Sequence, residues 1–298
     1  MYNFPLVSIG LTTYNRPTHL KNALFKLSNQ TYKNIEIIVA DDNPLNEDNF
    51  LIYKNNFSTD SRINYHKKTV NEGMNLNFIY ALSKARGKFF MWAADDDDWA
   101  ENYIEECVQI LEANDDVLMA CTKAYLMNNK YEIFNIHNAD INTSKLPLKE
   151  KQKKILKNIP PYNTGFYGLY RTAFLKTCYF PNSLSNDRIL VLETATKGEI
   201  VQSDKVLFYY CSEGDSVNIN KYLMATKAPM NSFLKAIPAL NMIFLHLKGV
   251  LFHWDHVSLY GKLITVKSLI RSWKSENRFN IIYQQICKLF LTKVLWKK

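Results

Sequence analysis

The sequence predicts an α/β protein built around a mainly parallel central sheet with helices on its faces. Through the first hundred residues, short apolar runs rich in β-branched residues alternate with helical segments, which is the pattern of βαβ units. Three of these runs also end abruptly in polar residues. In sheets of this kind ligands bind beyond the carboxyl ends of the strands, so the polar ends are candidate binding residues.

The first hundred residues contain four predicted strands. The first, Leu6–Thr12, is followed by a turn at 15–17 and by a helix over about 18–28. The next elements are, in order, a strand at Ile35–Ala40, a polar loop with a helix, a short strand at Arg62–His66, a helix at Asn75–Ala85 and a strand at Lys88–Ala93. The first, second and fourth strands end in Thr12–Arg16, Asp41–Asp42 and Asp95–Asp98, at what we expect to be one edge of the sheet.

The following residues are expected to complete the same domain. The predicted elements are a helix over 101–113, a strand at Val117–Tyr125, a polar Lys-rich loop over 130–160, strands at Phe166–Tyr170 and Val206–Tyr210, and a helix at Asp187–Lys197. From about residue 220 the pattern is helical to the end, with breaks at Pro229 and Pro238.

The charge of the chain is unevenly placed. The 298 residues carry a net charge of +9, from 37 Lys and Arg against 28 Asp and Glu. From Lys221 onward there are 13 basic residues and two acidic ones, a charge of +11, so residues 1–220 carry −2. We therefore predict a slightly acidic α/β domain over 1–220 and a basic, amphipathic helical tail over 221–298.

Composition and absent motifs exclude several classes of protein. A content of 47% hydrophobic and 22% charged residues is that of a globular chain. The lack of G-x-G-x-x-G and P-loop motifs argues against dinucleotide oxidoreductases and P-loop NTPases. Five scattered cysteines without a C-x-x-C pair fit a reducing cytoplasm. The N-terminus lacks the features of a signal peptide, and charged or polar residues interrupt the apolar stretch 236–254, so we expect no membrane-spanning helix.

Four consecutive aspartates, Asp95–Asp98, follow a strand of aromatic and apolar residues. Adjacent carboxylates repel one another unless a cation lies among them. Oxygen ligands on a loop suit a hard cation, so the cluster predicts a site for Mg²⁺ or Mn²⁺ that also takes substrate phosphate oxygens. The structural alternative is that Asp97 or Asp98 caps a helix starting near 99–101.

Four segments, in this order and spacing, resemble those of the family 2 glycosyltransferases: LVSIGLTTYNR, IEIIVADDN, ARGKFFMWAADDDDW and SNDRILVLE. The resemblance covers about residues 5–217. It implies a GT-A, Rossmann-like fold. It also implies transfer of a sugar from a nucleotide-diphosphate donor to an acceptor hydroxyl, with inversion at the anomeric carbon.

The resemblance implies a donor site formed by the first, second and fourth strand ends. Thr12 and the turn from Tyr14 to Arg16 would border the nucleotide. Asp42 corresponds to the residue that contacts uracil in the family, so it would hydrogen-bond the base. Asp95 would lie near the ribose.

The resemblance also assigns the metal site. Asp96 corresponds to the metal-binding aspartate of the D-x-D element, and Ala94 stands at the usual first aspartate of that element. Asp97 is then a rival ligand for the cation.

Asp187 corresponds to the catalytic aspartate of the family, with Asn186 in place of the usual acidic neighbour and Glu213 near the position of a usual histidine. A carboxylate can take the proton of the acceptor hydroxyl while a divalent cation neutralises the leaving diphosphate. Direct displacement of this kind inverts the anomeric carbon and needs no covalent nucleophile. The alternative for Asp187 is an N-cap of the predicted 187–197 helix.

The basic tail interleaves Lys and Arg with Phe, Leu, Ile and Trp. Helices of this composition lie in the interface of anionic membranes. We expect the tail to hold the protein peripherally on the inner, cytoplasmic face of a membrane, near glycan or lipid-linked acceptors. The alternatives are a helical pair packed on the catalytic domain and an oligomer interface.

We predict a UDP-sugar as the favoured donor, a role in bacterial surface polysaccharide or lipooligosaccharide synthesis, and no nucleic-acid partner. One rival is a metal-dependent nuclease or nucleotidyltransferase, which explains the aspartates and the basic tail but leaves Asp42 and Asp187 unexplained. The other rival, suggested by Ala94, is a degenerate protein that binds a sugar nucleotide without turnover.

Overall fold

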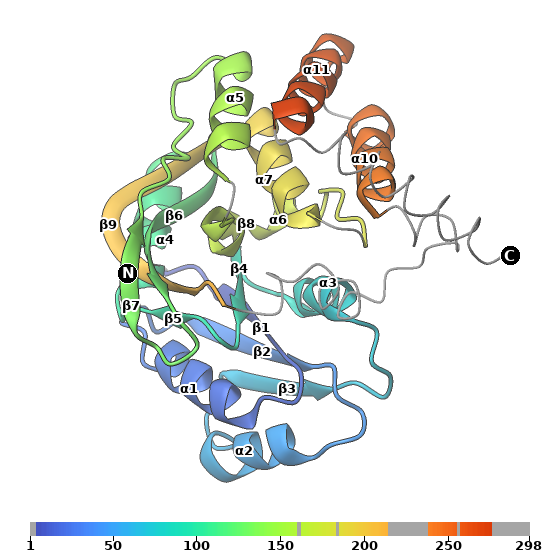
Figure 1. Ribbon diagram of the computed structural model, residues 1–298. Helices are drawn as coiled ribbons and strands as arrows, with labels where there is room; N and C mark the ends of the chain where they lie inside the picture. The colour runs from blue at the N-terminus through green and yellow to red at the C-terminus, as the bar shows by residue number, and fades with distance from the viewer. Residues whose placement is uncertain (1–3, 160–161, 183–184, 214–237, 255–256, 276–298) are drawn as a thin grey trace, which may run out of the picture.

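The computed structural model describes residues 4–159, 162–182, 185–213, 238–254 and 257–275. One nine-stranded sheet runs through it in the order β3-β2-β1-β4-β8-β6-β9-β5, with β7 paired to β6 (Figure 1). The strands are β1 (Val7–Thr13), β2 (Ile35–Asp41), β3 (Ile63–Lys67), β4 (Phe89–Ala94), β5 (Asp98–Trp99), β6 (Val117–Met127), β7 (Ile133–His137), β8 (Leu169–Arg171) and β9 (Glu199–Cys211).

Parallel pairing dominates the half of the sheet that carries the polar strand ends. β1 pairs in parallel with β2 and β4, and β2 pairs in parallel with β3. β6 and β9 form a further parallel pair, whereas β5, β7 and β8 run antiparallel to their neighbours. The register places Thr12 opposite both Ala40 and Ala94. The residues that follow on these three strands therefore emerge together at one edge, as the sequence predicted.

Helices cover both faces of the sheet. α1 (Pro17–Ser28) and α4 (Tyr103–Ala113) contribute buried residues to one face, and α3 (Met74–Lys84), α5 (Leu148–Asn158) and α7 (Asn186–Lys197) contribute to the other. The shorter elements are α2 (Asp48–Asn56), α6 (Thr172–Leu175) and a 3₁₀ turn, η1 (Thr164–Tyr167).

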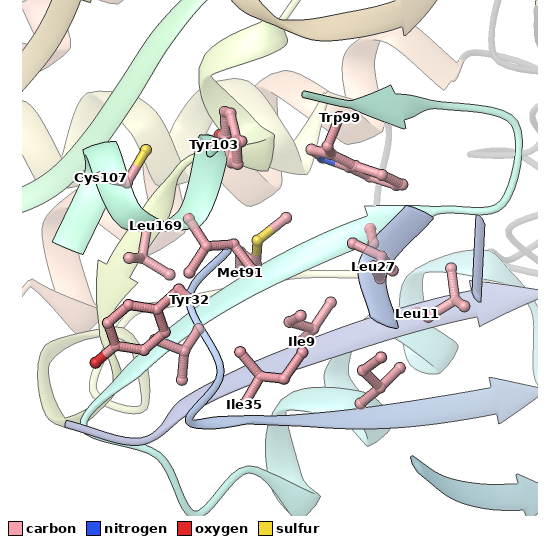
Figure 2. Packing of buried hydrophobic residues seen from close by; sticks show 14 of the residues in the cluster. Ile9, Leu11, Leu27, Tyr32, Ile35, Met91, Trp99, Tyr103, Cys107 and Leu169 are labelled. Atoms are coloured by element: carbon pink, nitrogen blue, oxygen red, sulfur yellow. The ribbon is translucent and has the colours of Figure 1, made fainter. Parts of the chain in front are cut away.

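The core follows the two-residue period of the strands. Ile9, Leu11 and Met91 point into the cluster beneath α1 and α4 (Figure 2). Phe90 and Trp92 of the same sheet point to the opposite face, into the cluster that α3, α5 and α7 line. Because the central strands are buried on both faces, they appear in the sequence as continuous apolar runs.

The structure corrects three expectations. The segment 130–160, expected to be a loop, contains β7 and α5. The expected strand Phe166–Tyr170 is instead η1 followed by β8. Asp98 lies in β5, and α4 begins only at Tyr103 without a side-chain cap, so the interpretation of Asp97 or Asp98 as a helix cap is wrong.

The described part of the tail consists of α10 (Pro238–Lys248), a π-helical turn, η3 (Gly249–His253), and α11 (Leu259–Ser275). Val250, Trp254, Leu269 and Trp273 are buried in the cluster that also contains residues of α5 and α7. This agrees with the alternative of a helical pair packed on the catalytic domain. Among the described residues no helix is long and apolar enough to cross a bilayer.

Residues 221–237 and 276–298 of the predicted tail, with the expected break at Pro229, lie outside the described residues. The other expected break, Pro238, is the first residue of α10. The division of the chain into a domain over 1–220 and a tail over 221–298 stays a prediction.

Candidate functional site

A cluster of carboxylates and one guanidinium group lies where β1 and β4 end. Arg16 Nη1 donates to Asp96 Oδ2 at 2.9 Å and to Asp95 Oδ1 at 3.2 Å. The hydroxyl of Thr13 donates to the other oxygen of Asp95 at 2.7 Å. Arg16 directly precedes the first residue of α1, so the β1–α1 turn brings it to the β4 end. Two carboxylates thus share one cationic nitrogen atom.

Asp95 is buried, and burial together with the neighbouring charge of Asp96 raises its pKa to about 7. Arg16 and the hydroxyl of Thr13 act in the opposite direction. Without further positive charge, part of the Asp95 population therefore carries a proton near neutral pH.

Asp97 is directed to a different part of the fold. It is buried, and its Oδ1 accepts the backbone N–H of Cys211, at the end of β9, at 2.8 Å. Its Oδ2 is buried without a hydrogen-bond partner among the described residues. Burial and the charge of Asp96 raise the pKa of Asp97 well above its ordinary value. Asp98, by contrast, forms an ion pair with Lys26 at 3.0 Å.

The residues at this edge fit a divalent cation that shares its coordination with a substrate. The oxygens of Asp95 and Asp96 already converge on one positively charged atom. Within the described residues there is no group of three His, Cys, Asp or Glu side chains that would hold a metal ion. Mg²⁺ is usually bound by one or two carboxylates, with water and substrate phosphates as the remaining ligands. Asp95 and Asp96 are two carboxylates that lie close enough together for this.

Asp42 holds a neighbouring loop. Its two carboxylate oxygens accept the backbone N–H groups of Glu72 at 3.0 Å and Gly73 at 2.7 Å, and Lys68 Nζ lies 3.7 Å away. Gly73 has φ of 94°, a conformation that favours glycine. Each Asp42 oxygen retains a second lone pair, so the carboxylate can still accept a hydrogen bond from a ligand.

The preceding Asp41 is engaged within the protein. Its fully buried carboxylate accepts the hydroxyl of Tyr65 at 2.5 Å and the amide of Asn49 at 3.2 Å, together with the backbone N–H of Asn43. Burial nevertheless raises its pKa. These contacts are typical of a buried structural carboxylate. Thr12, which lies opposite Ala40 in the sheet, is buried, whereas Tyr14 in the following turn is half-exposed.

Asp187 lies in the first turn of α7, and Ser185 occupies the N-cap position. The interpretation of Asp187 as the N-cap is therefore wrong. One oxygen of Asp187, Oδ2, accepts the side-chain amide of Asn163 at 2.8 Å. That contact joins the segment before η1 to the start of α7.

Tyr167 is close enough to both the aspartate loop and Asp187 for their charges to act on it. Burial raises the pKa of its phenol, and the negative charges of Asp97, Asp96 and Asp187 raise it further. A single ring therefore experiences the field of both acidic groups. The sequence did not by itself indicate a role for Tyr167, Thr13 or Asn163. The TTYN and PYNTG segments that contain Thr13 and Asn163 were the available signals.

A family model described as glycosyl transferase family 2 matches residues 8–178, more than half of the chain. The chain belongs to glycosyltransferase family 2. The match contains Arg16, Asp42 and the aspartate loop, whereas Asp187 lies beyond its end. The expectation of this family is confirmed.

Two relatives illustrate the sequence similarity to family 2 proteins. An uncharacterized glycosyltransferase of Rickettsia typhi is 34% identical over 119 residues, 39% of this chain and 36% of the relative. The GalNAc(5)-diNAcBac-PP-undecaprenol beta-1,3-glucosyltransferase of Campylobacter jejuni is 32% identical over 106 residues, 35% of this chain and 34% of the relative. The chain therefore spans about a third of the length of these two relatives.

Two solved structures share the fold. S. aureus TarS 1-349 in complex with UDP-GlcNAc has a TM-score of 0.64 and 17% identity, over 90% of this chain and 72% of that one. Mannosyltransferase PcManGT of Pyrobaculum calidifontis, in complex with GDP-Man and Mn²⁺, has a TM-score of 0.53 and 14% identity, over 100% of this chain and 89% of that one. At such identities the likeness concerns the fold alone, and it confirms the expected GT-A architecture.

Proposed function

We propose that the protein is an inverting glycosyltransferase that moves a hexosyl or related sugar from a nucleotide-diphosphate donor to a hydroxyl group of an acceptor. One observation carries the proposal. The carboxylates of Asp95 and Asp96 converge on the guanidinium group of Arg16 at the carboxyl ends of parallel strands, in a chain that belongs to glycosyltransferase family 2. That edge of an α/β sheet is where nucleotide ligands bind.

The proposed donor is a UDP-sugar. Thr12, Tyr14 and Arg16 border the nucleotide along the β1–α1 turn, and Asp95 lies near the ribose. Asp42 accepts an N–H of the base, using a lone pair left free by its two backbone contacts. The TarS structures with UDP-GlcNAc and with UDP support this choice of nucleotide, although PcManGT was solved with GDP-Man.

The proposed cofactor is manganese or magnesium, Mn²⁺ or Mg²⁺, held mainly by Asp96 with Asp95 beside it. Asp97 is the further candidate ligand, since its buried Oδ2 lacks a partner among the described residues. When bound, the divalent cation neutralises the charge that develops on the leaving diphosphate. The protein itself holds the carboxylates of Asp95 and Asp96 close together, on the same positively charged group.

Asp187 is the proposed general base. It takes the proton of the acceptor hydroxyl while the acceptor oxygen forms a bond to the anomeric carbon. The bond from that carbon to the diphosphate oxygen breaks, and its electron pair leaves with the nucleoside diphosphate. Asn163 donates to Oδ2 of Asp187 and so orients the carboxylate, whose other oxygen, Oδ1, is the proposed acceptor of the proton.

The proposed acceptor is a glycan or lipid-linked hydroxyl, in synthesis of bacterial surface polysaccharide or lipooligosaccharide. The Campylobacter jejuni relative, whose name includes an undecaprenol-linked glycan, supports this class. We place the protein in the cytoplasm, peripherally on the inner face of the membrane, and without a nucleic-acid partner.

Donor hydrolysis tests the proposal. We expect slow, Mn²⁺-dependent release of UDP from a UDP-sugar, abolished by Asp96→Ala. The matched control is Asp98→Ala in the same loop, because Asp98 pairs with Lys26 and not with Arg16. The control should retain more than half of the wild-type rate, and both variants should unfold near the wild-type temperature.

Three results would contradict the proposal. Binding of sugar nucleotides without turnover, across the common donors, supports the degenerate binding protein. Salt-sensitive cleavage of DNA supports the nuclease. Equal loss of UDP release in Asp96→Ala and Asp98→Ala would show that Asp96 is no more important for the reaction than its neighbour.

A further inference from the structure

The described part of the tail is a helical layer with two different faces. The inner face packs into the catalytic domain through the buried residues Val250, Trp254, Leu269 and Trp273. The inner face is also connected to the domain by a hydrogen bond and by a contact between two rings. Gln152 of α5 donates to Thr265 of α11 at 2.5 Å, and the rings of Tyr179 and His253 stack at 4.4 Å. This layer is therefore a fixed part of the fold.

The outer face of the layer is exposed and both apolar and cationic. Along α10 and η3 the exposed residues recur at helical spacing: Phe244, Lys248, Leu251 and Phe252. Along α11 the exposed row is Leu259, Leu263, Lys267, Ile270 and Arg271. Phe252 and Leu259 are 70% and 71% exposed, and exposed apolar residues that gather on one surface mark an interaction site. We name these two rows together the outer face.

The two rows form one surface. Lys262 of α11 donates from Nζ to the backbone carbonyl of Leu251 in η3 at 3.0 Å. α10 and α11 lie side by side at one end of the molecule, opposite α2 (Figure 1). The only acidic residue in the sequence from 238 to 275 is Asp255, which lies outside the described residues. Every charged residue described on the outer face is therefore Lys or Arg.

We propose that the outer face docks the protein flat on an anionic lipid bilayer, with Phe252, Leu259 and Leu263 entering the interface. The proposal rests on the proposed function, since a membrane-linked acceptor explains why the enzyme would lie there. Lysine side chains beside exposed apolar residues can extend their ammonium groups to anionic headgroups while their stems stay in the apolar layer. A protein partner is the less suitable occupant because lysine is depleted in protein interfaces.

This arrangement also limits the distance from the bilayer to the proposed base. Tyr179 stacks on His253 of η3, and Asp187 follows Tyr179 by eight residues. A chain of that length spans at most about 29 Å when fully extended. A layer docked at the outer face would therefore hold Asp187 within about 29 Å of Tyr179, which contacts that layer.

Vesicle co-sedimentation of the full chain tests the proposal. The variant Leu263→Glu/Lys267→Glu alters the outer face, and the matched control Leu51→Glu/Lys54→Glu alters an exposed Leu and Lys on α2. With vesicles of phosphatidylcholine and phosphatidylglycerol, we expect the first variant to lose about tenfold in partition and the control less than about twofold. The wild type should not bind vesicles of phosphatidylcholine alone. Phe252→Ser is a second variant of the outer face that leaves all charges in place, and it should weaken binding several-fold.

Donor hydrolysis in solution separates this proposal from the proposed function. Both double variants should release UDP at the wild-type rate, because neither alters the aspartate loop or Asp187. Equal vesicle binding by both variants would overturn the proposal, since another segment, such as 276–298, would then carry the membrane contact. A lower oligomeric mass of the Leu263→Glu/Lys267→Glu variant, without any change in vesicle binding, would identify the outer face as an interface between copies of the chain.

Discussion

Replacing Arg16 by glutamine should tighten the binding of Mn²⁺ to the protein without donor. The guanidinium group contacts Asp96, the main proposed cation ligand, at 2.9 Å and the neighbouring Asp95 at 3.2 Å. A divalent cation at Asp96 must displace that contact or weaken it. Glutamine keeps much of the side chain's length and polarity but removes the competing charge.

The size of the effect follows from the exposure of the pair. A hydrogen bond between charged groups contributes about 1.5–3 kcal/mol, and less where water screens the charges. The side chains of Arg16 and Asp96 are 29% and 17% exposed, so the pair is only partly screened. We take about 1–2 kcal/mol, which corresponds to a dissociation constant for Mn²⁺ about 5- to 30-fold lower in Arg16→Gln.

The assay is electron paramagnetic resonance of free Mn²⁺ at pH 8, where the Asp95 carboxyl, with a pKa of about 7, is mostly ionised. It needs neither donor nor turnover. Lys26→Gln is the matched control, because it removes the same charge from the neighbouring ion pair with Asp98. Mn²⁺ binding to Arg16→Gln that is no tighter than to the wild type would refute the competition between Arg16 and the cation.

Three other predictions concern the base, the buried loop and the core. Asp187→Asn should lower the rate of sugar transfer by about 10²- to 10⁴-fold, which is the usual contribution of a general base. Calorimetry should find the affinity for the donor unchanged. Sugar transfer at the wild-type rate would exclude Asp187 as the base. Because the folded-state pKa of Asp95 is raised above its unfolded value, its carboxyl lowers stability as pH rises from about 4 to about 7, and the cost persists above that range. Asp95→Asn should therefore raise the free energy of unfolding by about 1–3 kcal/mol at pH 8 and by less at pH 5, and denaturant titrations with an equal gain at both pH values would contradict this reasoning. A Cβ added at Gly10 would lie 2.7 Å from the Phe90 ring and 2.9 Å from Ala81 Cβ, so Gly10→Ala should destabilise the fold by about 1–3 kcal/mol; an unchanged melting temperature would show that the ring moves freely.

The elements predicted well are those whose own residues dictate them. β1, β2 and β4 are buried on both faces and were visible as continuous apolar runs. α7 was predicted to within one residue of its observed start. α5 was missed because most of its residues are Lys, Glu, Gln or Asn, and its buried Ile155 and Gln152 pack against α7 and α11, which lie far away in sequence. β7 is exposed along most of its length and is held by pairing with β6.

The sequence by itself determined the α/β class, the strand ends that form the candidate site and the acidic loop at its centre. These depend on local patterns, namely apolar runs that stop at polar residues. Only the tertiary structure decided which carboxylates share the guanidinium group of Arg16. Asp95 and Asp96 meet Arg16, whereas Asp97 is held by an amide of β9, 114 residues further along the chain. Only the tertiary structure, likewise, divided the basic tail into a packed face and an exposed one. Side-chain direction depends on neighbours that are distant in sequence, and no local pattern contains that information.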